Sequence, residues 1–181
     1  MSHIRLKSMW PYAGLPILAI ALLLVRVWRT EPFVMLQYEL IVVFGYVTAI
    51  IDLKTRRIPN SLILAMLTAW VLTITPMLFI YANASVEYIK DSALGFAFGG
   101  GLFLLVYMIS RKGLGGGDVK FMAVAGLYLG FGGAIPVMLY GTVLAALTGL
   151  TLVLLKRIGR KDAIPLAPFL YAGILVTVFL Q

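Results

Sequence analysis

Two aspartates stand beside residues that could shape a reaction site in a chain that is otherwise mostly apolar. Asp118 follows the glycine-rich residues 113–117, and Asp52 follows an earlier apolar run. A carboxylate costs roughly 2.5–3.5 kcal/mol at the centre of a membrane helix, so its default interpretation is functional. If the two carboxylates met, the ionised member could take a proton from water while the protonated member polarised a carbonyl. That is the chemistry of an aspartic protease.

The residue types exclude several other mechanisms. The chain contains no cysteine, and its single histidine, His3, lies in the polar amino-terminal tail. A thiol nucleophile, a thiolate metal site and a histidine-based triad are therefore ruled out. The paired-acid mechanism needs none of these groups, so we expect neither a metal nor a cofactor.

The glycines before Asp118 suit a backbone that passes close to a ligand. Glycine exposes bare N–H and C=O groups, with which an extended peptide could pair as an added strand. A phosphate-binding loop is disfavoured because the Gly-Lys-Ser/Thr ending is missing. A plain turn, with a structural Asp118 paired to Lys120 or Arg111, remains the simpler alternative.

Composition indicates an all-α, polytopic integral membrane helix bundle. Hydrophobic residues make up 62% of the 181 residues and charged residues only 12%, whereas soluble domains carry roughly 25% charged residues. We predict a single domain over residues 1–181 with about seven transmembrane helices, namely a six-helix core over residues 33–181 and an extra helix over residues 12–28. The predicted segments are 12–28, 33–51, 61–82, 92–110, 119–131, 134–155 and 164–180, with a polar loop over residues 83–91 and a turn at Gly132-Gly133.

Charge predicts the orientation of these segments. The net charge of +8 comes from short basic clusters between apolar runs, a pattern typical of cytoplasmic loops and not of nucleic-acid binding. With the amino terminus inside, twelve of the fifteen basic residues fall in the cytoplasm; the other three are Arg26, Arg29 and Lys90. Two whole crossings separate Asp52 from Asp118, so both aspartates are expected on the cytoplasmic face. The predicted location is the inner (cytoplasmic) membrane.

Other polar and small residues within the spans have plainer interpretations. We expect Glu39 to lie near the outer end of its helix, paired or facing the bundle, with a catalytic role the less favoured option. The pairs Gly95/Gly99 and Gly126/Gly130 have the spacing of close helix–helix contacts in lipid.

Two motifs then carry a resemblance. Asp52 with Ile58, Pro59 and Asn60, followed by Gly115-x-Gly117-Asp118 with Lys120, resembles the type IV prepilin peptidase family of GxGD membrane aspartic proteases. Residues 164–170, Ile-Pro-Leu-Ala-Pro-Phe-Leu, are similar to a late element of that family. The likeness covers roughly residue 41 to the carboxyl end.

The resemblance implies cleavage, on the cytoplasmic side, of the basic leader of prepilin-like or preflagellin-like precursors, just before their hydrophobic helix. Asp52 and Asp118 would be the catalytic pair, and Gly115 and Gly117 would shape the loop. Lys120, Pro59 and Asn60 would have accessory roles. The absence of cysteine implies a short, peptidase-only form without the four-cysteine methyltransferase domain of long members.

Three alternatives remain beside this interpretation. A transporter or proton channel could use intramembrane acids as relays, although both aspartates fall at the ends of spans and not near the midplane. An inactive scaffold could retain the fold. A presenilin-like enzyme shares the glycine–aspartate motif but typically has Tyr-Asp on the preceding helix, whereas Asp52 follows Ile51.

Overall fold

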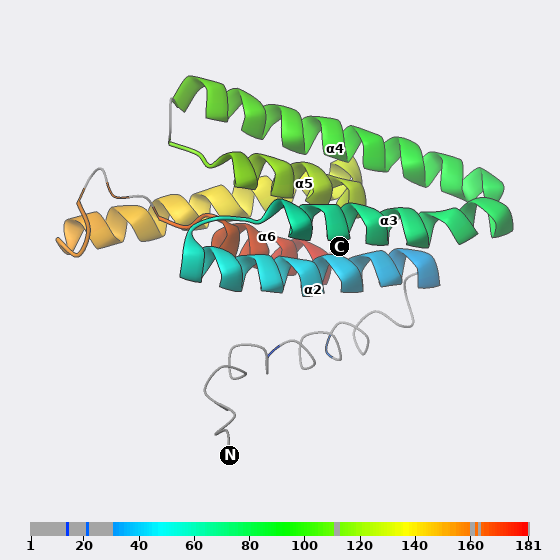
Figure 1. The fold of residues 1–181 in the computed structure, drawn as a ribbon, viewed down its shortest axis with the longest axis horizontal. Coiled ribbons are helices and arrows are strands. Elements are labelled where there is room, and N and C mark those ends of the chain that lie inside the picture. Colours follow the sequence, from blue (N-terminus) through cyan, green and yellow to red (C-terminus); the bar gives the residue numbers. More distant parts are fainter. Residues whose placement is uncertain are drawn as a thin grey trace, which may run out of the picture.

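The computed structural model describes Gly14, Ala21 and residues 31–110, 113–159, 162 and 164–180. All regular elements within these residues are helices, and they pack side by side (Figure 1). In chain order they are α2 (Pro32–Thr55), α3 (Asn60–Ile80), α4 (Ala82–Ser110), α5 (Gly116–Leu154) and α6 (Ala167–Leu180). The predicted helix over residues 12–28 lies outside the described residues, apart from two positions.

Four of the five helices, α2 to α5, are long and apolar enough to cross a membrane, and α6 is a shorter apolar helix. An all-α, multi-pass membrane protein is therefore confirmed. The described helices do not establish seven crossings.

The observed helices are longer than the predicted spans where polar residues extend an apolar run. Helix α2 continues through Thr55, so Asp52 lies in its last turn and not in the loop that follows. The polar loop predicted over residues 83–91 is wrong, because α4 already begins at Ala82. Its first turns are polar but helical, and Lys90 pairs with Glu87 one turn earlier, 2.7 Å apart. A run of apolar residues marks only the part of a helix that spans the membrane. The helix can continue beyond that run, because polar residues such as Glu and Lys are themselves good helix formers.

Helix α5 is broken inside, at Gly130. This residue has φ 67° and ψ −176°, a conformation that glycine adopts without steric cost. The turn predicted at Gly132-Gly133 is therefore wrong by a few residues. In Figure 1 the start and the end of α5 lie on the same side of the molecule, so the break turns the chain back. The two arms correspond to the segments predicted over residues 119–131 and 134–155.

The break at Gly130 leaves backbone groups without their helical partners, and side chains of the neighbouring helices replace those partners. An unpaired amide in apolar surroundings is costly, so these contacts stabilise the bend. The bonds are Trp70 Nε1–H to Leu127 O (3.1 Å), Tyr88 O–H to Tyr128 O (3.2 Å) and Phe131 N–H to Asp91 Oδ1 (3.2 Å).

The predicted glycine contacts between helices are confirmed. A Cβ atom placed on Gly95 of α4 would overlap the backbone of Gly126 and Gly130 on α5, and one placed on Gly126 would overlap the backbone of Gly95. The two helices therefore cross with their backbones in direct contact, which a larger side chain would prevent.

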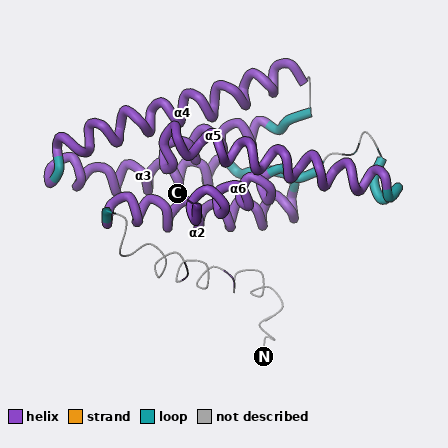
Figure 2. The backbone as a smooth tube through the Cα atoms, turned by 180° about the vertical axis from the view of Figure 1, so that it is seen from behind, coloured by secondary structure: helices purple, strands orange, loops and turns teal. Residues whose placement is uncertain are grey.

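The connections after α2, α4 and α5 gather at one end of the bundle. Residues 56–59, 113–115, 155–159 and 164–166 lie on the same side in Figure 1 and again when the molecule is seen from behind in Figure 2. Both aspartates lie at this end, because Asp52 is in the last turn of α2 and Asp118 is in the first turn of α5.

Candidate active site

Asp52 and Asp118 line the same pocket. The cavity has a volume of about 270 Å³, and its lining comes from the end of α2 with the following loop and from the start of α5. The lining residues are Asp52, Arg56, Arg57, Ile58, Gly115, Gly116, Gly117 and Asp118. The structure therefore brings the two predicted motifs together in one polar site.

Asp52 is a buried carboxylate held by a distant part of the chain. Its side chain is 5% exposed, and Oδ2 accepts the backbone N–H of Ala167 at 3.1 Å. Ala167 begins α6, so the negative charge lies at the positive end of that helix dipole. The sequence had marked residues 164–170 as part of the family resemblance but gave them no role. Their backbone contact with Asp52 is a functional feature that sequence reasoning missed.

Asp118 is held by its own loop. It is the third residue of α5, and its Oδ2 accepts the N–H of Gly115 at 3.2 Å, which caps the helix start. The side chain is only partly buried, and its charge interacts electrostatically with that of Asp52. In each carboxylate Oδ2 accepts a backbone N–H, from Ala167 in Asp52 and from Gly115 in Asp118.

Two of the three glycines that line the pocket leave little room for a side chain. A Cβ atom on Gly115 would lie 2.9 Å from Asp118 Oδ2, and one on Gly117 would lie 3.0 Å from Ile58 Cβ. A Cβ atom on Gly116 would meet nothing within 4 Å. Gly130 is the glycine with positive φ among the described residues, so Gly115 and Gly117 serve close approach and not an unusual backbone conformation.

The turn after Asp52 contributes basic side chains to the pocket. Arg56 has left-handed backbone angles (φ 52°, ψ 33°), and its N–H bonds to the Asp52 carbonyl at 2.7 Å. This turn ends α2 and directs Arg56, Arg57 and Ile58 past Asp118. Ile58 belongs to the first of the two sequence motifs, and Arg56 and Arg57 lie between it and Asp52 in the sequence.

The accessory residues occupy positions beside the pocket. Lys120 Nζ donates a hydrogen bond to Asn60 Oδ1 at 2.9 Å, which joins the start of α5 to the start of α3. Pro59 precedes α3, and its carbonyl accepts the N–H of Leu62 at 3.1 Å. None of these three residues lines the pocket. Lys120 bonds to Asn60 and not to Asp118, which contradicts the simple-turn alternative as far as Lys120 is concerned; Arg111 lies outside the described residues.

Glu39 lies away from this site. It precedes Asp52 by thirteen positions on α2, which corresponds to roughly 20 Å along the helix axis. The side chain is partly buried, and its Oε1 has no hydrogen-bond partner among the described residues. The geometry gives Glu39 no part in the pocket. No cluster of three or more His, Cys, Asp or Glu side chains suited to a metal ion occurs in the described part of the chain.

Comparison with known proteins identifies the family. Residues 39–150, which include both aspartates, match the model of the type IV leader peptidase family. The chain belongs to the type IV leader peptidase family. The resemblance seen in the two motifs is thereby confirmed.

Curated relatives in this family are named prepilin leader peptidase/N-methyltransferase. The protein from Bacillus subtilis is 30% identical over 70% of this chain and 48% of its own length. That from Xanthomonas campestris is 27% identical over 93% of this chain and 62% of its own length, and that from Legionella pneumophila is 26% identical over 84% and 53%. The chain thus spans about half the length of the curated relatives it matches. No solved structure matches it significantly.

Proposed function

We propose that this member of the family is a membrane aspartic endopeptidase that removes the basic leader of type IV prepilin-like or preflagellin-like precursors. One observation carries the proposal: Asp52 and Asp118, from different helices, line one polar pocket at the end of an apolar bundle. The printed name of the curated relatives, prepilin leader peptidase, supplies the substrate class.

In this mechanism the ionised carboxylate of the pair takes a proton from a water molecule, and the water oxygen attacks the scissile carbonyl carbon. The protonated carboxyl gives its proton to the carbonyl oxygen. The tetrahedral intermediate then collapses as the C–N bond breaks: the leaving amine takes a proton from the carboxyl that received the water proton, and the other carboxylate takes back a proton from a hydroxyl group of the intermediate. One carboxylate of the pair is thus again ionised and the other protonated. Neither metal nor cofactor is required.

The surroundings of the pair favour this chemistry. Backbone N–H groups fix one oxygen of each carboxylate, so that little reorganisation is needed when the reaction begins. Gly115 to Gly117 present bare backbone along one wall, where an extended peptide could pair by main-chain hydrogen bonds. Arg56 and Arg57 add positive charge to the lining of the pocket, which could hold an anionic lipid headgroup or an acidic residue of the substrate.

The finer topology belongs to the same proposal. Residues 12–28 and the two arms of α5 would bring the number of crossings to seven, in the inner membrane. The positive-inside rule then places the amino terminus and the pocket in the cytoplasm. For the 181 residues given we propose peptidase activity alone, because the four-cysteine domain associated with methyl transfer requires cysteines that these residues lack.

A cleavage assay in membranes tests the assignment. A prepilin-like precursor is co-expressed with the wild type, Asp52→Asn or Asp118→Asn, and the leader is followed by the mobility of the precursor. Asparagine keeps the shape and the hydrogen-bond acceptor, so the variants should still insert while losing cleavage. Cleavage by both variants would refute the catalytic pair. The transporter alternative is not favoured, since the chain belongs to a peptidase family and both acids lie at helix ends.

A further inference from the structure

The segment that leads into α6 contains two prolines, Pro165 and Pro168, and the two residues between them are Leu166 and Ala167. Proline has no backbone N–H, so Leu166 and Ala167 supply the amide donors of this segment. The Ala167 N–H bonds to Asp52 Oδ2 at 3.1 Å, and the Leu166 N–H interacts with the same carboxylate. Both amides that the prolines leave therefore serve one side chain.

The next amides of the first turn are satisfied within α6. The N–H groups of Phe169 and Leu170 both bond to the Leu166 carbonyl, at 3.0 and 3.1 Å. The first amides of a helix are commonly capped by a side chain that is close in sequence. The cap of α6 is instead Asp52, which lies 115 positions earlier on another helix. The bond that caps α6 therefore also fixes the direction of this carboxylate.

Close packing holds α6 against two neighbouring helices, α2 and α5. A Cβ atom on Gly45 of α2 would lie 2.9 Å from Tyr171 Cδ2. Gly45 lies seven positions before Asp52, which is about two helical turns. A Cβ atom on Gly141 of α5 would lie 3.0 Å from Leu170 Cα. Because a tightly packed interface transmits displacement and does not absorb it, the place of α6 sets the place of its first amides.

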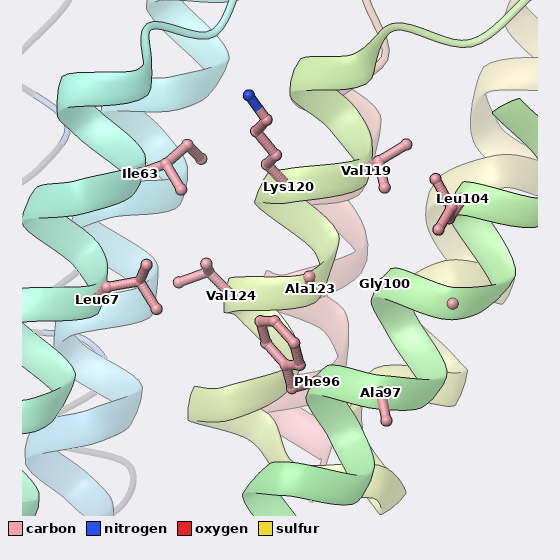
Figure 3. A pocket seen from close by; sticks show the side chains of 11 residues that line it. Ile63, Leu67, Phe96, Ala97, Gly100, Leu104, Val119, Lys120, Ala123 and Val124 are labelled. Carbon is pink, nitrogen blue, oxygen red and sulfur yellow. The ribbon is translucent and has the colours of Figure 1, made fainter.

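The start of α5, which carries Asp118, has a different environment. An apolar cavity of about 470 Å³ lies between α3, α4 and α5 (Figure 3). Its lining includes Val119, Lys120 and Ala123, and Val119 directly follows Asp118. Asp118 is held by its own loop, at a helix start that borders this cavity. Of the two carboxylates, Asp52 is therefore the one that a separate, closely packed helix holds in place.

We propose that residues 165–168 are a positioning element for the cleavage reaction. Their two amides hold the Asp52 carboxylate in the orientation that proton transfer requires. They act through Asp52 on the chemical step, and none of the four residues lines the pocket in which a substrate would bind. Donors that are already in place need no reorganisation during the reaction, which is the physical reason for the expected gain in rate. The inference rests on the proposed function, in which Asp52 belongs to the catalytic pair.

Replacement of single amide bonds by ester bonds tests the donor directly, because an ester removes one N–H and keeps the shape of the backbone. The α-hydroxy analogue of alanine, incorporated in place of Ala167, removes the donor to Asp52. The α-hydroxy analogue of leucine in place of Leu170 is the matched control. It removes a bond to the Leu166 carbonyl in the same turn and leaves the contact with Asp52 intact. Initial rates on a prepilin-like precursor in membranes give kcat and KM per inserted enzyme.

We expect the ester at Ala167 to lower kcat by about 10–100-fold with an unchanged KM, and the ester at Leu170 to keep a kcat close to that of the wild type. A merely structural role would lower kcat alike for both esters, so equal kcat values would overturn the inference, as would a change confined to KM. If the wild type cleaves the precursor and the ester at Ala167 cleaves equally fast, this inference alone fails. If the wild type cleaves no prepilin-like precursor, the proposed function fails and the inference fails with it.

Thermal unfolding in detergent checks the pairing without reference to activity. The ester at Ala167 should lower the unfolding temperature of the wild type but should not lower that of Asp52→Ala any further, because the acceptor is already gone in that variant. The ester at Leu170 should lower the unfolding temperature of both backgrounds alike. An equal loss from the ester at Ala167 in both backgrounds would show that this amide acts independently of Asp52 and would overturn the inference.

Discussion

In two regions of this molecule an aspartate accepts a backbone N–H at the start of a helix, but the two arrangements have different roles. At the pocket, Asp52 and Asp118 accept backbone N–H groups at the starts of α6 and α5. At the break in α5, Asp91 accepts the N–H of Phe131, which begins the second arm. Asp91 precedes the end of α4 by nineteen positions, roughly 28 Å along the helix, and does not line the pocket.

The difference lies in what surrounds each carboxylate. Asp52 and Asp118 face a common cavity together with arginines and glycine backbone, and their charges interact. Asp91 instead contacts Gly130, whose bend it stabilises. An acid in an apolar helix therefore does not indicate a reaction site by itself; a second carboxylate and an open cavity are what distinguish the proposed site from Asp91.

The largest expected effect is on the cleavage rate, which should fall when an aspartate of the pocket is replaced but not when Asp91 is replaced. Asp52→Asn and Asp118→Asn should each lower the cleavage rate by about 10²–10⁴-fold, because each removes one general acid–base group. Asp91→Asn should cleave like the wild type, because its amide oxygen still accepts the Phe131 N–H. Initial rates on a prepilin-like precursor in membranes, normalised to inserted enzyme, decide the matter. If Asp91→Asn inserted normally but did not cleave the precursor, Asp91 could no longer be distinguished from the two aspartates of the pocket.

The second effect concerns the glycines of the pocket. Gly115→Ala pushes against Asp118 Oδ2 and Gly117→Ala against Ile58, so both should displace the catalytic carboxylate and slow cleavage by about 10–100-fold. Gly116→Ala has free space and should remain close to the wild-type rate. The three variants differ by one methyl group at adjacent positions. Equal rates for all three would show that the loop does not position Asp118.

The third effect sharpens the role of Asp91 as a structural cap. Asp91→Ala removes the acceptor for Phe131 N–H and should lower the free energy of unfolding by about 1–2 kcal/mol, as loss of a helix cap does. Thermal unfolding in detergent measures the change. The cleavage rate per folded molecule should be unchanged, and a specific loss of rate would give Asp91 a part in catalysis.

The smallest effect concerns the link between the two motifs beside the pocket. Lys120→Met keeps the stem that lines the apolar cavity but loses the hydrogen bond to Asn60, at a cost of about 1 kcal/mol. Asn60→Ala breaks the same bond from the other side. In thermal unfolding, the double variant should lose no more unfolding free energy than either single variant. Losses that add up in the double variant would contradict a direct hydrogen bond between Lys120 and Asn60.

The sequence by itself determined the class of fold and limited the chemistry that the chain could carry out. Long apolar runs require helices in lipid, because only helices satisfy every backbone group within one segment. The absence of cysteine and of an internal histidine left carboxylates as the reactive groups. The spacing of basic residues placed Asp52 and Asp118 at one end of the bundle, and their surrounding motifs indicated the family that the comparison confirmed.

Only the tertiary structure decided how these parts meet. The hydrogen bond from Ala167 to Asp52 joins residues 115 positions apart, and no local pattern specifies such a contact. The break in α5 fell at Gly130 and not at the neighbouring glycine pair, because Asp91, Trp70 and Tyr88 are placed to satisfy the groups that a break there exposes. Residues 83–91 were wrongly predicted as a loop because hydropathy reports how well a segment fits into lipid and does not report its propensity to form a helix. Local sequence sets which residues can react, whereas packing between distant helices sets which of them share a pocket.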